Sequence, residues 1–217
     1  MSTISILLSP FKTFSKFLDF IPPELLHSLF IGFLKTQLYK TNTSFENLKI
    51  KVFGNEFKNP LGLAAGFDKN AEVYNSLFKL GFGFVEVGTI TPLKQYGNPK
   101  PRVFRLVEDE ALINRLGFNN LGAKNIFDRI KSNKQIGLLG INIGPNKESE
   151  NRLQDYLQCL KIFHTVADYI TINISSPNTE DLRSFHDQTK LDELLQEINK
   201  EKKNLRSEIP IAVKVSP

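Results

Sequence analysis

The sequence predicts an α/β fold in which a parallel β-sheet is covered by helices. From residue 60 onward, short apolar runs alternate with amphipathic helical patterns, and the runs are apolar almost throughout. Strands buried on both faces have this continuous apolar character, and parallel strands are usually connected by helices. Polar residues follow the apolar runs, which places candidate ligand-binding groups at one edge of the sheet.

Two short amphipathic helices are expected before the sheet. Apolar residues recur at helical spacing within residues 11–21 and again within 25–34, and Pro22-Pro23 separates the two stripes. Such helices usually pack on their own domain, and the pattern alone favours this interpretation. The stripes also fit a membrane interface, with Phe and Leu buried in the lipid and lysines on the opposite side.

Five strands and four helices are expected in the remainder of the chain. The strand candidates are residues 61–65, 83–88, 137–143, 168–175 and 210–215. The helix candidates lie near residues 71–80, 119–131, 151–167 and 189–206. No internal repeat or low-complexity segment is evident beyond this alternation, so the pattern predicts one layered α/β unit.

Polar side chains end each predicted strand. They are Asp68 and Lys69 after the first, Thr89 after the second, Asn142 in the third, Asn173, Ser175 and Ser176 in the fourth, and Lys214 in the fifth. The carboxyl ends of parallel strands point to one face, where α/β proteins bind their ligands. We therefore expect the five strand ends to converge on one site that offers Lys, Asn, Ser and Thr.

Composition and motifs argue against several function classes. A net charge of +5 fits an anionic ligand, an anionic membrane surface or no special partner. No basic run with interleaved aromatics occurs, so no nucleic-acid partner is expected. No cluster of His, Cys and carboxylates predicts a metal site, and no GxGxxG, Walker or GxSxG motif is present. The single cysteine, Cys159, excludes an internal disulfide and favours a reducing compartment.

Targeting signals are also not expected from the sequence. No run of roughly 18 apolar residues could span a bilayer. The N-terminus has no basic segment before its apolar run, and Pro10 interrupts that run, which argues against a secretory signal. The first arginine is Arg102, which argues against an Arg-rich transit peptide.

The remaining polar residues indicate an amide-rich pocket. Six asparagines lie after strand ends or in adjoining loops, namely Asn114, Asn119, Asn120, Asn142, Asn173 and Asn178. Amides donate and accept along the edge of a planar heterocycle, and Lys69 or Lys214 could neutralise a carboxylate or a developing ring charge. Any single Asn in a loop more often forms an Asx-turn. The residues alone therefore indicate a planar, anionic, nitrogen-rich ligand or cofactor without identifying it.

Six stretches in order resemble one enzyme family. They are NPLGLAAGFDKN (59–70), GFGFVEVGTITP (81–92), GNPKPRVFRL (97–106), INRLGFNNLG (113–122), LGINIGPNK (139–147) and INISSPNT (172–179). Together they resemble dihydroorotate dehydrogenase, specifically its quinone-dependent, membrane-associated class 2. PELLH (23–27) resembles the N-terminal helices of that class. The soluble class generally uses a cysteine base, and Cys159 is far from the SSPNT loop, which favours the quinone class.

The resemblance implies a (β/α)8 TIM-type barrel that binds FMN. The residues that it places along the cofactor are Ala65, Gly66, Phe67, Asp68, Lys69, Thr89, Asn142, Asn173 and Lys214. The residues that it implies for dihydroorotate are Lys69, Asn114, Arg115, Leu116, Gly117, Phe118, Asn173 and Asn178. His27 and Arg105 match positions beside the quinone tunnel.

The implied chemistry oxidises dihydroorotate to orotate in pyrimidine biosynthesis. The second serine of SSPNT is the base in this family, so Ser176 would remove the C5 proton while C6 delivers a hydride to FMN. Electrons then pass to a membrane quinone, which implies a peripheral protein on the cytoplasmic face of the cell membrane. An unassisted serine is a weak base, so a desolvated site and a relay are expected. Thr179 and Thr165 are both candidate relays.

The sequence is shorter than the implied barrel. Eight strands need about 250 residues, whereas 157 residues follow residue 60. We interpret residues 1–45 as a helical membrane and quinone-tunnel segment and 46–217 as a partial FMN-binding barrel, truncated after about five strands. The absent part would supply three strands, phosphate-binding loops and another substrate Asn. The alternative interpretation is a non-catalytic remnant or a split-chain assembly partner.

Overall fold

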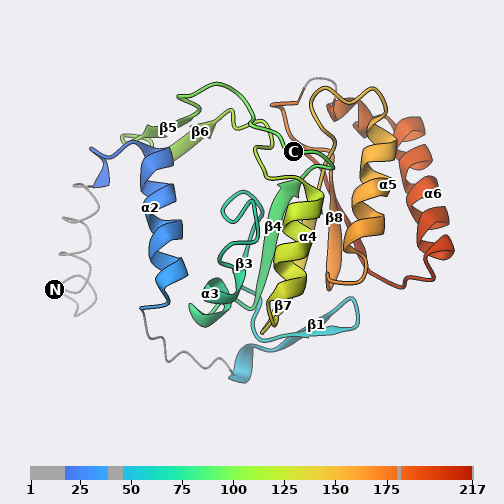
Figure 1. Ribbon diagram of the computed structural model, residues 1–217, viewed down its shortest axis with the longest axis horizontal. Coiled ribbons are helices and arrows are strands. Elements are labelled where there is room, and N and C mark those ends of the chain that lie inside the picture. Colours follow the sequence, from blue (N-terminus) through green and yellow to red (C-terminus); the bar gives the residue numbers. More distant parts are fainter. Residues whose placement is uncertain (1–17, 39–45, 180–181, 217) are drawn as a thin grey trace.

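The computed structural model describes residues 18–38, 46–179 and 182–216 (Figure 1). Helix α2 (Pro23–Thr36) comes first and confirms the helix expected over 25–34. Most of the helix expected over 11–21 lies outside the described residues. The short 3₁₀-helix η1 (Glu46–Leu48) then leads into the α/β part of the chain.

The five predicted strands form one parallel sheet in the order β3-β4-β7-β8-β9. They are β3 (Gly62–Leu63), β4 (Phe84–Ile90), β7 (Leu138–Ile143), β8 (Tyr169–Asn173) and β9 (Ile211–Lys214). Each strand pairs in parallel with the next, with a register shift between Val87 and Ile90 where β4 pairs with β7. Among the described residues the sheet is open, with β3 and β9 at its edges.

The four predicted helices connect these strands. They are α3 (Tyr74–Lys79), α4 (Ala123–Ser132), α5 (Arg152–Phe163) and α6 (Gln188–Asn204), with the 3₁₀-helix η2 (Leu182–His186) before α6. Asn151 caps α5 by accepting from the Gln154 N–H, and Asp187 caps α6 by accepting from the Lys190 N–H. Helix α3 begins later than predicted, because the Asp68 carboxylate accepts from the N–H groups of Glu72 and Val73 just before it.

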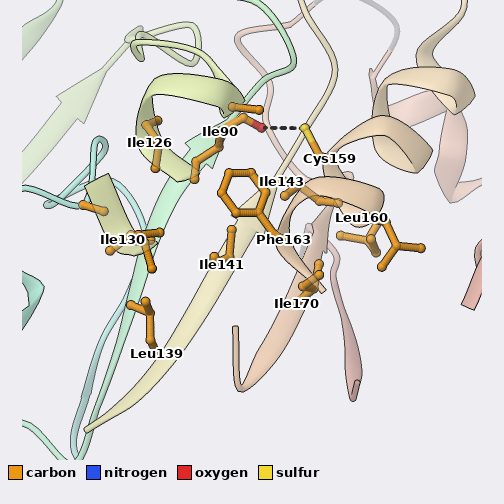
Figure 2. Packing of buried hydrophobic residues seen from close by; sticks show 14 of the residues in the cluster. Ile90, Ile126, Ile130, Leu139, Ile141, Ile143, Cys159, Leu160, Phe163 and Ile170 are labelled. Atoms are coloured by element: carbon orange, nitrogen blue, oxygen red, sulfur yellow. Dashed lines mark hydrogen bonds between the residues drawn. The ribbon is translucent and has the colours of Figure 1, made fainter. Parts of the chain in front are cut away.

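The main core lies between the sheet and helices α4 and α5 (Figure 2). Alternate residues of β4, β7 and β8 are fully buried, and Ile141 and Ile170 are examples. They pack with Ile126 of α4 and Phe163 of α5. Because successive strand residues point to opposite faces, the residues between them point to the other face of the sheet. That face is the inner side of a partial barrel.

Two antiparallel hairpins were not expected from the sequence. β1 (Ile50–Val52) and β2 (Asn55–Phe57) pair around a turn at Phe53-Gly54, where both residues have positive φ. β5 (Val103–Leu106) and β6 (Ala111–Asn114) form the second hairpin, which lies beside α2 (Figure 1). The second hairpin therefore brings the segment after β6 toward the site.

Candidate functional site

Three predicted site residues meet at the carboxyl ends of β4, β7 and β8. Thr89 Oγ1 donates to Asn142 Oδ1 at 2.7 Å. Asn173 Nδ2 donates to Asn142 Oδ1 at 3.1 Å and to Thr89 Oγ1 at 3.0 Å. All three residues are buried, and Asn142 is 0% exposed. The convergence expected from strand direction is therefore present for these residues.

Strand β8 ends because Asn173 redirects the chain. Its side-chain oxygen accepts from both the backbone N–H and the hydroxyl of Ser175, at 3.1 and 3.0 Å. This is an Asx-turn, and it replaces the ladder hydrogen bonds of a continuing strand. Ser176 follows half-buried, and its hydroxyl oxygen accepts from the Asn178 N–H at 3.2 Å.

The two candidate relay threonines lie at opposite ends of β8. Thr179 is in the loop of Ser176, is 3% exposed, and its buried hydroxyl has no hydrogen-bond partner among the described residues. Thr165 is exposed in the turn after α5, before β8 begins. The geometry therefore favours Thr179 as the hydroxyl nearer to Ser176.

The loop after β3 is tied to the end of β4. Gly66 N–H donates to Gly88 O at 2.8 Å, and Gly88 N–H donates to Asp68 O at 3.1 Å. Both Asp68 carboxylate oxygens are used on backbone N–H groups before α3, and burial raises the pKa of this carboxyl. Asp68 therefore contacts the end of β4 through its backbone carbonyl, whereas its carboxylate binds the turn before α3.

Lys69 is the half-buried cation of this loop. Its Nζ donates to the Gly66 carbonyl. Burial lowers the pKa of Lys69, and the nearby Arg102 charge lowers it further, while Glu24 and Asp68 act in the opposite direction. Lys214 differs from it: this residue is exposed on β9, where it is aligned in register with Asn173.

The predicted substrate segment, residues 114–118, contacts the Ser176 loop. Asn178 Nδ2 donates to the Asn114 carbonyl at 3.4 Å. The Phe118 ring and the Thr89 methyl group lie about 3 Å from the position that a Cβ atom on Gly144 would take, so Phe118 reaches the polar cluster. Arg115 instead donates to the Pro101 carbonyl through Nε and Nη2, which stabilises the segment from outside.

A cavity of about 940 Å³ lies between α2, the loop after β3 and the β5–β6 hairpin. Residues predicted for the quinone and residues predicted for the substrate both line this cavity. His27 and Arg105 belong to the first group, and Lys69, Asn114 and Leu116 belong to the second. His27 Nε2 donates to the Phe67 carbonyl at 2.7 Å. Burial lowers the pKa of His27, and the Lys69 charge lowers it further, although the Phe67 hydrogen bond opposes this shift.

Arg105 connects the second hairpin to the turn before α2. Its Nη1 donates to the carbonyls of Leu18, Asp19 and Ile21, at 3.3, 3.1 and 3.4 Å, and its Nε lies 3.5 Å from the Asp19 carboxylate. In the described structure its guanidinium thus has a structural role beside the cavity.

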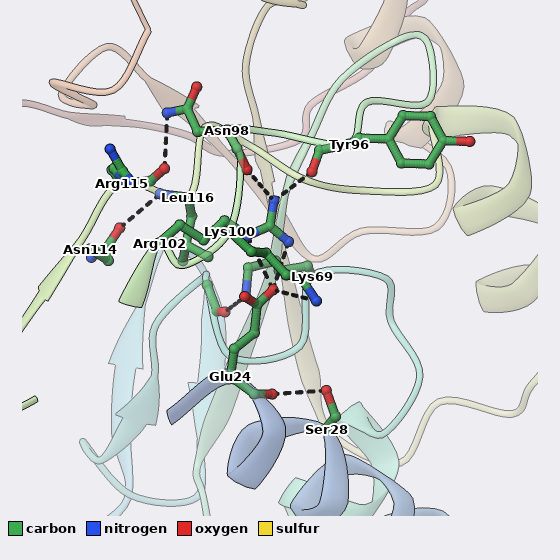
Figure 3. Close-up of polar contacts among 11 residues, drawn as sticks. Glu24, Ser28, Lys69, Tyr96, Asn98, Lys100, Arg102, Asn114, Arg115 and Leu116 are labelled. Carbon is green, nitrogen blue, oxygen red and sulfur yellow. Dashed lines mark hydrogen bonds and ion pairs between the residues drawn. The ribbon is translucent and has the colours of Figure 1, made fainter. Parts of the chain in front are cut away.

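An ion pair that was not expected from the sequence lies beside Lys69 (Figure 3). Arg102 is 7% exposed at its side chain and donates to Glu24 Oε1 at 2.6 and 3.1 Å. Its Nη1 also donates to the carbonyls of Tyr96 and Asn98. Arg102 is part of the stretch GNPKPRVFRL, and a buried arginine needs a carboxylate partner. Its partner, Glu24, is 78 residues away, so the stretch alone did not reveal the ion pair.

The open parallel sheet and its polar edge are those of a partial α/β barrel with a candidate ligand site at the strand ends. A profile of the dihydroorotate dehydrogenase family matches residues 47–217. Relatives named dihydroorotate dehydrogenase (quinone) include one from Bartonella henselae, 47% identical over 91% of this chain and 56% of that protein. Another, from Rhizobium etli, is 45% identical over 97% of this chain and 60% of that protein.

A solved structure agrees with these sequence matches. The crystal structure of DHODH in complex with ferulenol from Eimeria tenella superimposes with a TM-score of 0.85 at 37% identity, covering 90% of this chain and 60% of that chain. The chain therefore belongs to the dihydroorotate dehydrogenase family, and both the resemblance and the partial barrel fold are confirmed. It spans 56–60% of the length of these relatives.

Proposed function

We propose that this chain provides the N-terminal part of an FMN-dependent dihydroorotate:quinone oxidoreductase. The observation that carries the proposal is the meeting of Thr89, Asn142 and Asn173 beside the Ser176 loop. That loop contacts Asn114, which lines the same cavity as Lys69. Family membership makes oxidation of dihydroorotate to orotate the reaction that these groups would serve.

Two features support a flat cofactor at this edge. Gly66 has a φ of +113°, and a Cβ atom there would meet nothing within 4 Å, so its main chain borders open space. Asn119 Oδ1 is buried near the cavity and has no partner among the described residues, so a ligand N–H could use it. Both suit the ring of FMN, which when bound accepts a hydride and passes electrons to a quinone.

The residues of this chain would divide the remaining work. Ser176 would take the C5 proton of dihydroorotate, with Thr179 as the neighbouring hydroxyl that could pass it on. Lys69 would hold the anionic carboxylate of the substrate, and Asn114 and Asn178 would fix the polar edge of its ring. The predicted cofactor role of Lys214 requires its exposed side chain to turn toward the edge, and it remains a prediction.

The cavity under α2 would admit the quinone. Its apolar lining includes Phe30 and Ile31, and His27 and Arg105 are among its polar groups. No helix among the residues that the structure describes combines the length and apolar character needed to cross a bilayer. Leu25, Leu29 and Phe33 of α2 are exposed, which supports attachment at a membrane surface, and we propose the cytoplasmic face of the cell membrane.

Flavin release and flavin reduction, measured on the purified full-length protein, test this proposal. It should release FMN on denaturation, lose its flavin absorbance when dihydroorotate is added without oxygen, and recover it with a soluble quinone. Ser176→Ala should retain the flavin and reduce turnover by about 10²–10⁴-fold, the usual contribution of a general base. Thr165→Ala is the matched control, since this exposed hydroxyl lies at the other end of β8 and its loss should leave turnover unchanged.

Two results would contradict the proposal. Loss of flavin in Ser176→Ala would make this serine architectural rather than catalytic. Wild-type protein without flavin and without dihydroorotate oxidation would favour the alternative, a non-catalytic remnant or a split-chain assembly partner.

A further inference from the structure

The carboxylate of Glu86 lies on the inner face of the sheet, opposite α4 and α5. It occupies the middle of β4, between two fully buried core valines. Three neutral groups donate to it: Asn142 Nδ2 at 2.8 Å, Thr171 Oγ1 at 2.8 Å and Tyr169 Oη at 3.2 Å. The function proposed above gives no role to this carboxylate.

Gly140 makes the contact with Tyr169 possible. Glu86, Gly140 and Tyr169 are aligned in register across β4, β7 and β8. A Cβ atom on Gly140 would lie 2.1 Å from the Tyr169 ring, so a larger residue would displace the ring from the carboxylate. Burial raises the pKa of Tyr169, and the Glu86 charge raises it further, so its hydroxyl remains a donor.

An ionised carboxylate sets the direction of the hydrogen bonds beyond it, because it can only accept. Asn142 must therefore turn its amide nitrogen toward Glu86, and its oxygen faces Thr89 and Asn173. Asn173 consequently presents its nitrogen to that oxygen. The oxygen of Asn173 is then left to accept from the N–H and hydroxyl of Ser175.

We propose that Glu86 is a positioning residue for the Ser175-Ser176 segment, acting through Asn142 and Asn173. Without an acceptor at position 86, the Asn142 amide can rotate by half a turn and place its nitrogen against that of Asn173. If Asn173 rotates in response, its nitrogen faces the Ser175 N–H, which loses its acceptor. The inference rests on the proposed function only for the catalytic role of Ser176.

Hydrogen exchange at the Ser175 amide in the full-length protein measures this effect. Glu86→Met removes the acceptor at similar side-chain length, and exchange should accelerate by about 5- to 10-fold, as expected for a lost hydrogen bond. Glu86→Gln can keep an oxygen toward Asn142 while its nitrogen donates to the hydroxyls of Thr171 and Tyr169. Its exchange rate should stay within about twofold of wild type.

Thr171→Val is the matched control. It removes a donor from the same carboxylate but leaves the link to Asn142 in place, so exchange at Ser175 should not change. An unchanged Ser175 rate in Glu86→Met, or an equal acceleration in Thr171→Val, would overturn the proposal.

A second variant covers failure of Glu86→Met to fold. Asn142→Leu removes the acceptor that holds the Asn173 amide nitrogen, so Ser175 exchange should again accelerate. Asn142→Asp is its control, because a carboxylate presents only acceptors to Asn173, and Ser175 exchange should stay slow. An unchanged rate in Asn142→Leu, or an accelerated rate in Asn142→Asp, would overturn the proposal.

Flavin reduction gives a readout that separates the two proposals. Reduction by dihydroorotate, measured per bound flavin, should slow by about 5- to 10-fold in Glu86→Met, and it should recover in Glu86→Gln. Unchanged reduction in Glu86→Met would overturn positioning of Ser176. Wild-type flavin that dihydroorotate does not reduce would contradict the proposed function, while Ser175 exchange would still decide the role of Glu86.

Discussion

Lys69 illustrates how surroundings change the chemistry of one residue. Its ammonium group donates to Gly66 and lies near the guanidinium of Arg102. Burial and this second positive charge both disfavour the protonated form, so they lower its pKa, and Glu24 offsets part of the effect. A lysine in this position is a strong partner for an anion only while it keeps its proton.

Under the proposed function, the pH dependence of orotate binding should report this pKa. Orotate is an anion, so its affinity should fall as pH rises through the Lys69 pKa, and the fall should begin below the range of an ordinary lysine. The affinity is measured by titrating orotate into the protein at increasing pH and following the flavin spectrum. Lys69→Gln should bind more weakly at neutral pH and lose this alkaline dependence. If the orotate affinity of the wild type fell only in the pH range of a free lysine, the pKa of Lys69 would not be lowered.

Helix α2 is held against the barrel by contacts along its whole length. Glu24 pairs with Arg102 near its start, and His27 donates to the Phe67 carbonyl one turn later. Near its end, the Leu34 carbonyl accepts from Ser76 Oγ at 2.9 Å, and Lys35 pairs with Glu72 at 2.8 Å. These contacts leave its apolar outer side exposed and close one wall of the cavity.

Removing the Glu24 carboxylate should loosen α2. Glu24→Ala leaves the buried Arg102 guanidinium without its anion, which should reduce the free energy of unfolding by about 1–3 kcal/mol. Backbone amides of α2 should then exchange faster. Lys100→Ala is the control, since Lys100 is 70% exposed and lies 3.6 Å from the same carboxylate, and exposed pairs contribute about 0–1 kcal/mol. Equal effects of the two substitutions would rule out Arg102 as the anchor.

At the scale of the whole molecule, one core joins the sheet to its helices. Phe163 of α5 is fully buried and contacts the Phe127 ring of α4 at a centroid distance of 6.3 Å. Ile141 of β7 lies beneath it (Figure 2). Because the strands that carry the site also supply this core, packing behind the sheet holds the strand ends in register.

Truncation of Phe163 should destabilise the entire domain. Phe163→Ala removes a buried ring and leaves a cavity, which costs about 3–5 kcal/mol. Urea unfolding of the full-length protein measures the loss as a lower midpoint. Phe20→Ala removes the same atoms from a side chain that is 87% exposed, so its midpoint should change little. A small decrease in the urea midpoint of Phe163→Ala would mean that the core closes around the missing ring.

Local patterns in the sequence were sufficient for the five parallel strands, the helices that connect them and their common polar edge. Periodicity marks each buried element, and chain direction alone sends parallel strand ends to one side. The β1–β2 hairpin could have been found from Phe53-Gly54, since glycine in a two-residue turn favours a hairpin. The role predicted for Ser176 came from family resemblance, because a serine after a strand otherwise indicates a turn.

Only the tertiary structure decided which polar groups face one another. Asn142 and Glu86 are 56 residues apart, and Arg102 and Glu24 are 78 apart, so no local pattern could pair them. Their contacts depend on strand register and on where α2 packs. The sequence by itself thus determined the five parallel strands, their connecting helices and their common edge, whereas long-range packing determined the direction of each hydrogen bond there.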